Sequence, residues 1–358
     1  MILIVDCNLK TLKISVFKKK DKRLSSECFS KDMDEIRDDE SFKKYIQIII
    51  GKNKIKAISF RILFGGDYFD KPVLIDPIFF VKFEKLTDAF PFYVPVMMET
   101  IKRFIRVFKN KPLIAFFETA YFLKLPDEER FYAMPFEYYR DNKIKKCGFH
   151  GILHEENSKK FSEKDKTISI VFDSQTTVCS ISGKKPLSVS LGYTPLEGVM
   201  SRTSSGDVDP GIVFYLMNVH NFSIYKIDEM LKKESGFLGL TGHDIELKDM
   251  VKLLGKDVKV DQAFDIYQAQ IMKYIGEGIS VMGGVDNIIF AGSNVNILIP
   301  VIYSIVKKIS FLGINTKNLP WGEEQEIIDI TTDESKIKTF INKIDIAKVI
   351  FNESVQNY

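Results

Sequence analysis

The chain has 358 residues, of which 45% are hydrophobic and 28% are charged, and its formal net charge is +3. These values are typical of a soluble globular protein with a large core, and the length favours two domains over one. Acidic and basic residues are interspersed, and the four cysteines lack CxxC spacing, so the sequence argues against a nucleic-acid-binding protein, a zinc site and a disulfide framework.

The first predicted elements are two strands on either side of a polar turn. Ile2–Val5 and Leu12–Phe17 are short β-rich runs, and they flank the turn Asp6–Thr11. The basic cluster within Lys18–Arg23 falls where the next hairpin turn is expected, so we interpret it as a solvated turn. No apolar run is long enough for a signal-peptide core or a membrane span. We therefore expect a cytoplasmic protein without a membrane partner.

The second half of the chain repeats this order of elements. Thr167–Phe172 and Val178–Ile181 are predicted strands around the polar turn Asp173–Thr177, and a further turn is expected at Ser182–Lys184. Helices follow in both halves, and the clearest are Ser41–Ile50, Val96–Phe108, Asp209–Met217 and Asp261–Val281. Because each half opens with a strand, an Asp-led turn and a second strand, the sequence predicts two related α/β domains.

The most informative stretch is Gly192–Gly211, which reads GYTPLEGVMSRTSSGDVDPG. Glycine permits close approach of the backbone to a ligand, and hydroxyl groups and Arg202 are good partners for an oxyanion. Asp209 is a helix N-cap, and Pro210 suits the first helical position. A polar loop that leads into a helix N-terminus suits phosphate binding, and an ordinary capped loop is the alternative.

This stretch closely resembles the acetate kinase family, in which a GFTPLEG…GTRSGDIDP run lines the active-site cleft. Glu234–Gly242 (ESGFLGLTG) is similar to the family's ESGLLGLTG, and Ala115–Tyr121 opens a stretch similar to VFDTAFHQTMP. The resemblance extends from Ile2 to about Glu334. It implies the duplicated two-domain α/β fold of acetate and sugar kinases, Hsp70 and actin, with a cleft between the domains.

We place the domain boundary near Cys147, which gives an N-terminal domain of residues 1–147 and a C-terminal nucleotide-side domain of residues 148–332. The resemblance implies that the final segment, residues 333–358, crosses back to the first domain. Two helices are expected in this segment, at Ser335–Phe340 and Ile344–Phe351.

Two of the four histidines lie in Gly148–His154, which reads GFHGILH and is similar to the family's GFHGxSH. His150 and His154 are spaced one helical turn apart. The residues alone leave a structural pair, a metal pair or a phosphoryl-binding pair open, and the lack of further ligands at metal spacing disfavours zinc. The resemblance implies that His150 donates to the phosphoryl group in transit and that His154 supports the site.

Phe60–Gly66 reads FRILFGG and is similar to the family's HRxVHGG. The resemblance implies that Arg61 binds the carboxylate substrate and the phosphoryl group, and a surface arginine at a strand end is the alternative. Glu118 stands where the family has an Asp that supports the metal and catalysis, and Glu334 matches a Glu that assists magnesium binding. Asp6 joins these two as a candidate magnesium ligand.

Other segments depart from the family pattern. Phe172–Thr176 (FDSQT) replaces the phosphate loop HLGNG, Gly292–Ile297 (GSNVNI) replaces GGIGEN, and Pro91–Pro95 (PFYVP) replaces PLHNP. The family's loop arginine is Ser204 here, and Arg202 lies two residues earlier. The resemblance places Tyr93 and Pro195 with Arg61 as substrate-binding residues and implies the following nucleotide-binding residues: Thr11, Lys13, Asp173, Gln175, Thr176, Gly292 and Asn296.

The resemblance therefore implies a phosphotransferase that moves a phosphoryl group between ATP, or another phosphodonor, and a small carboxylate such as acetate. Its cofactors would be Mg²⁺ and ATP, and its assembly a homodimer. Arg61 would hold the acceptor, His150 would stabilise the transferring group, Glu118 and Glu334 would serve the metal, and Arg202 would assist catalysis. The alternative is a catalytically impaired relative that binds a ligand or partner, which the altered loops motivate.

Overall fold

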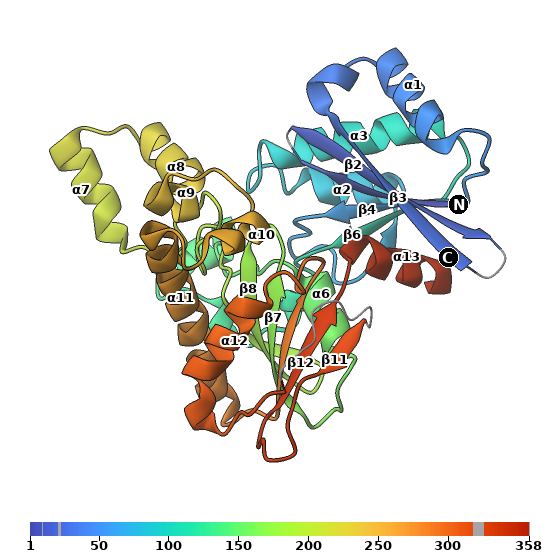
Figure 1. Ribbon diagram of the computed structural model, residues 1–358. Coiled ribbons are helices and arrows are strands. Elements are labelled where there is room, and N and C mark those ends of the chain that lie inside the picture. The colour runs from blue at the N-terminus through green and yellow to red at the C-terminus, as the bar shows by residue number, and fades with distance from the viewer. Residues whose placement is uncertain (9, 21–22, 318–325, 358) are drawn as a thin grey trace. The chain divides into compact units, whose positions relative to one another are not determined.

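The computed structural model describes residues 1–8, 10–20, 23–317 and 326–357, and the chain forms two compact units (Figure 1). Unit 1 contains Met1–Leu123 together with Asp345–Tyr358, and unit 2 contains Lys124–Ile344. Each unit is built around a six-stranded mixed sheet of its own. The two-domain α/β fold expected from the sequence is therefore confirmed.

The sheet of unit 1 has the strand order β3-β2-β1-β4-β6-β5. Strands β1, β4 and β6 are parallel to one another, and the other neighbours pair antiparallel. Both faces of β4 and β6 are buried, as expected for parallel strands covered by helices. The strands are β1 Ile2–Cys7, β2 Thr11–Lys20, β3 Arg23–Asp32, β4 Ala57–Ile62, β5 Val73–Leu74 and β6 Leu113–Phe117.

The helices of unit 1 include the two that the sequence predicts at Ser41–Ile50 and Val96–Phe108. Helix α1 begins after Asp38, whose carboxylate accepts the backbone N–H groups of Glu40 and Ser41. The helices are η1 Met33–Ile36, α1 Asp39–Ile50, α2 Pro77–Glu84, α3 Tyr93–Val107, η2 Tyr121–Lys124 and α13 Ile346–Asn357.

Unit 2 repeats the topology of unit 1. Its sheet, followed from β9, has the order β9-β8-β7-β10-β12-β11, and its parallel and antiparallel pairs match those of β3-β2-β1-β4-β6-β5. The predicted duplication is thus present strand for strand. The strands are β7 Lys166–Phe172, β8 Thr176–Ser182, β9 Lys185–Val189, β10 Asn287–Gly292, β11 Ile327–Asp329 and β12 Lys338–Lys343.

The core of unit 2 forms where the long helix α11, Val258–Met282, packs against β7 and β8. Phe264, Tyr267 and Ile271 lie fully buried on this helix. Its other helices are α4 Asp127–Arg130, α5 Phe136–Asn142, α6 Gly151–Ser158, α7 Pro210–His220, α8 Ile224–Lys233, α9 Gly236–Thr241, α10 Leu247–Met250, η3 Val251–Leu253, α11 Val258–Met282, α12 Ile299–Lys308 and η4 Ser310–Leu312. Helices α7 and α11 match the predictions at Asp209–Met217 and Asp261–Val281. Among the described helices, none has both the length and the apolar character to cross a membrane.

The helix predicted at Ser335–Phe340 is wrong. Residues Lys338–Lys343 form strand β12, which pairs in parallel with β10 and antiparallel with β11. Thr339 and Ile341 on this strand are buried in the sheet, and both are β-branched. The basic cluster of the first half lies at the predicted hairpin between β2 and β3, and its Lys22 falls outside the described residues.

The structural units divide the chain at other positions than the sequence suggested. The segment from Lys124 to Cys147 belongs to unit 2, because the backbone N–H of Cys147 donates to the carbonyl of Gly192 and Lys146 Nζ donates to the carbonyl of Val189. Residues 333–344 stay in unit 2 because β12 completes its sheet.

Only α13 and the residues around it return to unit 1, as expected for the predicted helix at Ile344–Phe351. Helix α13 packs against β1 and β4. The buried hydroxyl groups of Ser354 and Ser59 lie 2.7 Å apart, and the ring of Phe351 stacks on that of Phe17 with the centroids 4.7 Å apart. These contacts fix the end of the chain to the first sheet.

Candidate functional site

Three ionisable side chains of unit 1 meet at the carboxyl end of its parallel strands. Asp6 and Arg61 are register partners near the ends of β1 and β4. Glu118 directly follows β6, and its backbone N–H donates to the carbonyl of Ile62. Since ligands of α/β sheets bind at the carboxyl ends of the strands, this edge is the natural place for a site.

Arg61 lies between the two carboxylates. Its Nε donates to Oε1 of Glu118 at 2.5 Å, and its Nη1 donates to Oδ2 of Asp6 at 3.0 Å. Arg61 is 8% exposed and Glu118 is fully buried, so the alternative of a surface arginine is wrong. The second oxygen of Glu118, Oε2, is buried without a hydrogen-bond partner among the described residues.

Tyr93 and two further residues shape the backbone beside Arg61. The Tyr93 hydroxyl accepts the backbone N–H of Leu63 at 2.9 Å, and burial raises the pKa of this phenol well above its usual range. The N–H of Gly65 donates to Oγ1 of Thr119 at 3.0 Å. A Cβ on Gly65 would lie 2.8 Å from the Phe117 ring, which explains the glycine at this close approach. The sequence alone does not indicate this role of Thr119, because its partner Gly65 lies 54 residues away in the chain.

The turn between β1 and β2 is shaped by Asn8. Its Oδ1 accepts the backbone N–H groups of Lys10 and Thr11 at 2.9 and 2.8 Å. Lys13 is the cross-strand register partner of Asp6. The predicted nucleotide-binding residues Thr11 and Lys13 therefore lie on the same turn and strand pair as Asp6. Leu9, within this turn, is outside the described residues.

The corresponding edge of unit 2 brings together Asp173 and Gly292. Asp173 follows β7 and Gly292 ends β10, which is parallel to β7. Gly292 has φ 151°, and a Cβ there would lie 2.3 Å from the carbonyl oxygen of Phe172. Only glycine allows the two strand ends to approach this closely.

Two side chains of this turn that were predicted to bind the nucleotide instead form hydrogen bonds with other residues of unit 2. Gln175 Nε2 donates to the carbonyls of Pro195 and Val199 at 2.8 and 3.2 Å. The Thr176 hydroxyl is hydrogen-bonded to the Tyr267 hydroxyl. The side chains of Gln175 and Thr176 are buried, so they support the turn. The accessible charge of the turn is the carboxylate of Asp173.

The two histidines of the GFHGILH motif converge on one hydroxyl. His150 Nδ1 and His154 Nε2 lie 3.2 and 2.8 Å from Thr177 Oγ1. His150 directly precedes α6 with φ 61°, and its Nε2 lies 3.8 Å from Oδ2 of Asp173. Burial, with a smaller effect of His150, holds the pKa of His154 well below its usual range, so His154 is neutral. Among the described residues no group of three or more His, Cys, Asp and Glu side chains is placed to hold a metal ion.

The loop Gly192–Gly211 is held by one hydrogen bond within the loop and by two tyrosines from outside it. Gly198 N–H donates to Asp207 Oδ1 at 2.7 Å, and Tyr274 donates to the other Asp207 oxygen at 2.6 Å. Tyr132 donates to Glu197 at 2.5 Å. The loop borders a cavity of about 250 Å³ lined by Tyr132, Tyr193, Thr194, Leu196, Glu197, Ser205, Gly206, Asp207, Val208 and Leu231.

The remaining predicted site residues lie at the surface of unit 2. The Arg202 side chain is 40% exposed and is paired with Asp244 and Glu246, not with a predicted site residue. Pro195, Asn296 and Glu334 are exposed, and the Pro195 carbonyl accepts the Gln175 amide.

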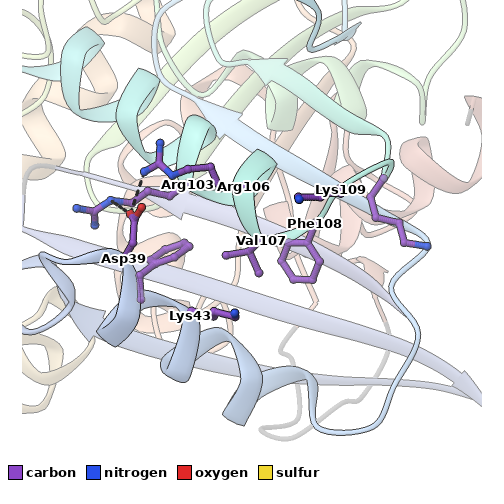
Figure 2. A pocket seen from close by; sticks show the side chains of 9 residues that line it. Asp39, Lys43, Arg103, Arg106, Val107, Phe108 and Lys109 are labelled. Carbon is purple, nitrogen blue, oxygen red and sulfur yellow. Dashed lines mark hydrogen bonds and ion pairs between the residues drawn. The ribbon is translucent and has the colours of Figure 1, made fainter.

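A cavity in unit 1 is lined by none of the predicted site residues. Figure 2 shows Arg103 and Arg106 turned toward Asp39 at this cavity of about 570 Å³. Arg103 also donates to the carbonyls of Ile36 and Arg37, so its guanidinium serves the packing of α3. The lining residues are Asp39, Phe42, Lys43, Arg103, Arg106, Val107, Phe108, Lys109 and Lys111.

The model of the acetokinase family matches residues 3–352 of the chain. The chain belongs to the acetokinase family. It is 34% identical over 328 residues to the acetate kinase of Fervidobacterium nodosum, covering 86% of this chain and 80% of that protein. It is also 34% identical over 301 residues to the acetate kinase of Thermosipho melanesiensis, covering 80% and 73%. The family membership expected from the sequence is confirmed.

Solved structures of acetokinase-type enzymes share the fold. The Porphyromonas gingivalis acetate kinase superposes with a TM-score of 0.89 at 23% identity, covering 99% of this chain and 98% of that one. The Francisella tularensis propionate kinase gives a TM-score of 0.86 at 23% identity, covering 98% and 97%. The homologues indicate a carboxylate kinase, the enzyme class expected from the sequence.

Proposed function

We propose that this member of the acetokinase family transfers a phosphoryl group between ATP and acetate or a closely similar small carboxylate. The observation that supports it most strongly is the buried Arg61, held in a fixed orientation between Asp6 and Glu118 at the carboxyl edge of the first sheet. A planar guanidinium positioned in advance suits both a carboxylate and the oxygens of a phosphoryl group. Phosphoryl transfer depends mainly on such positioning and charge stabilisation.

Asp6 and Glu118 fit a magnesium ion that is shared with substrate phosphates. Mg²⁺ prefers oxygen ligands, keeps several waters and is held in kinases by one or two carboxylates. The Asp6 side chain is 33% exposed, and Glu118 Oε2 lacks a partner among the described residues. When bound, the metal would neutralise charge on the phosphate oxygens. Glu118 would also orient Arg61, and the role predicted for Glu334 stays a prediction.

In unit 2 we propose that His150 donates a hydrogen bond from Nε2 to the phosphoryl group. Thr177 occupies its Nδ1 side, and Nε2 faces Asp173 at the carboxyl end of β7. Asp173 and Gly292 would border the phosphates of the nucleotide, with Gly292 allowing close approach of the backbone. Gln175 and Thr176 would act by holding the turn in shape.

We expect the purified protein to form acyl phosphate from ATP and acetate in the presence of Mg²⁺, because the family scaffold and the Arg61 cluster are intact. Hydroxylamine trapping would measure the product, with ATP, GTP and pyrophosphate tested against acids of two to five carbons. Excess EDTA should abolish turnover and added Mg²⁺ should restore it. A folded protein that turns over no donor and acid pair would contradict the proposal.

We also propose that the protein is a homodimer that buries helix α7. This helix is apolar, none of its residues is buried, and it lies at the outer end of unit 2 (Figure 1). Ile212, Phe214, Tyr215 and Val219 expose large apolar side chains on it. Exposed apolar patches of this kind mark interaction sites, and most soluble oligomers are homo-oligomers.

Replacing Phe214 with Glu should therefore convert the dimer to a monomer. Light scattering coupled to size-exclusion chromatography would report the mass of each species. Phe311→Glu is the matched control, because Phe311 is 82% exposed on the same unit but outside α7. A monomeric wild-type protein, or a Phe214→Glu variant that remains dimeric, would rule out this interface.

A further inference from the structure

A continuous row of buried polar side chains links His150 to Asn342 on β12 of the second sheet. His150 and His154 share the hydroxyl of Thr177, and His154 Nδ1 lies 2.8 Å from Ser169 Oγ. The row continues through amide groups: Asn157 Nδ2 donates to Ser169 Oγ at 2.9 Å, and Asn342 Nδ2 donates to Asn157 Oδ1 at 2.8 Å. We call these residues the polar chain: Asn342, Asn157, Ser169, His154, Thr177 and His150.

The polar chain is almost completely shielded from water. His154, Asn157, Ser169 and Thr177 have no exposed surface, and Asn342 is 3% exposed. A buried polar group without a hydrogen-bond partner costs about 1–3 kcal/mol. Each donor in the polar chain must therefore be matched with an acceptor, which restricts the direction in which the hydrogen bonds run from one residue to the next.

The amide groups of Asn342 and Asn157, at one end of the polar chain, set the direction of its hydrogen bonds. Because Asn157 Nδ2 donates to Ser169 Oγ, the hydroxyl hydrogen of Ser169 is free to donate onward, and the acceptor within reach is His154 Nδ1. In the opposite direction Ser169 would accept from both Asn157 and His154. Its own hydrogen would then have no acceptor among the described residues.

Neutral His154 accepts a hydrogen bond on one ring nitrogen and donates one from the other, so it keeps the same hydrogen-bond direction between Ser169 and Thr177. A neutral imidazole has one N–H and one lone pair, so a lone pair at Nδ1 requires the proton to be at Nε2. His154 Nε2–H then donates to Thr177 Oγ1, and the Thr177 hydroxyl donates to His150 Nδ1. With Nδ1 accepting, a neutral His150 carries its proton on Nε2, the nitrogen 3.8 Å from Asp173.

We propose that Asn342, Asn157 and Ser169 are positioning residues that hold the proton of His150 on Nε2 through His154 and Thr177. The catalytic importance of this tautomer rests on the proposed function, because His150 must present an N–H to stabilise the phosphoryl group. The tautomer itself does not depend on any activity. It is a property of the folded chain and is measured without substrate.

The direct experiment is a long-range ¹H–¹⁵N correlation spectrum of the full-length protein labelled at histidine. It distinguishes protonated from unprotonated ring nitrogens, and only four histidines need assignment, with His220→Gln and His243→Gln variants to identify two of them. We expect both His150 and His154 to carry the proton on Nε2. A proton on Nδ1 of either ring would overturn the proposal.

The Asn342→Asp variant tests whether the amide groups of Asn342 and Asn157 set the tautomer of His150. The tautomer must be measured directly, because a change in turnover would not reveal it. An ionised carboxylate has no N–H, so Asn157 must turn its amide to donate to it and present Oδ1 to Ser169. Ser169 would then donate to Asn157, and the whole chain would reverse, which leaves His150 with its proton on Nδ1. The spectrum is recorded at a pH at which the ¹³C shift of the introduced carboxyl shows it to be ionised. An unchanged His150 tautomer would overturn the proposal.

Asn287→Asp is the matched control, because Asn287 is equally buried in the same sheet but lies outside the polar chain. It should leave both tautomers unchanged. Thr177→Val should disconnect the rings, so that Asn342→Asp on this background alters His154 alone, whereas Thr177→Ser should transmit the change. If the Asn342→Asp variant fails to fold, the histidine tautomers in the wild-type spectrum still test the proposal.

If the protein has the proposed activity, Asn342→Asp should lower kcat at least about 10-fold with little change in KM, since it removes a donor to the transition state. If the protein shows no turnover but the tautomers are as expected, the proposed function fails and the polar chain stands. If turnover is present but the tautomers differ from those expected, the proposal about the polar chain fails and the proposed function stands.

Discussion

Replacing Arg61 with Met should lower the rate of acyl phosphate formation by about 10²–10³-fold, because it removes a preorganised donor to the transferring group. Met is close to Arg in length but carries neither the charge nor the planar fork, so it cannot reproduce the contact. Steady-state kinetics with ATP and acetate would measure the effect. Arg106→Met is the control, because Arg106 lies on the surface of the same unit and is paired with Asp39 and Glu99. Its turnover should match the wild type.

The same Arg61 substitution should also destabilise the fold. Removing one partner of a buried ion pair typically costs about 3–5 kcal/mol, since the remaining charge is left uncompensated. Here that charge is the fully buried Glu118. Adding Glu118→Gln should recover most of the lost free energy of unfolding, measured by circular dichroism in urea, without restoring turnover. A double variant that regained activity would show that Arg61 acts only through stability.

Replacing His150 with Asn should lower kcat by about 10²–10³-fold and change KM little, because the lost hydrogen bond is made mainly in the transition state. Asn is the suitable substitute, since His150 has φ 61° and Asn tolerates the left-handed region better than most residues. The backbone at the start of α6 should therefore keep its shape.

His220→Asn is the matched control for this substitution. His220 ends α7 and is none of the predicted site residues, so kcat and KM of a variant that keeps the wild-type oligomeric state should equal those of the wild type. Thermal unfolding of both variants would check that the fold is intact. A His150→Asn variant with wild-type kcat would remove His150 from the mechanism.

The duplicated fold could be predicted from the sequence because its signals are local. A strand, an Asp-led turn and a second strand each have a short-range pattern, and they occur at both Ile2–Phe17 and Thr167–Ile181. The strand order could not be predicted from these patterns, since it depends on contacts between residues far apart in the chain.

The wrong helix at Ser335–Phe340 has a physical explanation. Thr332 and Asp333 are typical of a helix start, and a local pattern favours that interpretation. In the structure the open edge of β10 pairs with Lys338–Lys343 instead, and this pairing buries Thr339 and Ile341. Tertiary hydrogen bonding and burial outweigh local propensity here.

The sequence shows which residues are charged, but not which groups the uncharged side chains contact. Asp6, Arg61 and Glu118 are far apart in the sequence, and their convergence follows from the parallel pairing of three strands. By contrast, the roles of Gln175 and Thr176 depend on which groups face them, and the structure shows that they bind Pro195, Val199 and Tyr267. A single sequence does not show such partners.

The late position of α13 in the chain has a consequence for biosynthesis. Unit 2 is a continuous segment, Lys124–Ile344, whereas the first sheet lacks the helix that packs on β1 and β4 until residues 346–357 have been translated. Segments generally fold as units while they leave the ribosome. Unit 2 also completes its sheet late, with β12 at Lys338–Lys343, so both units should become native only near the end of synthesis. The earliest-synthesised strands should therefore wait longest, with apolar surface open to chaperones.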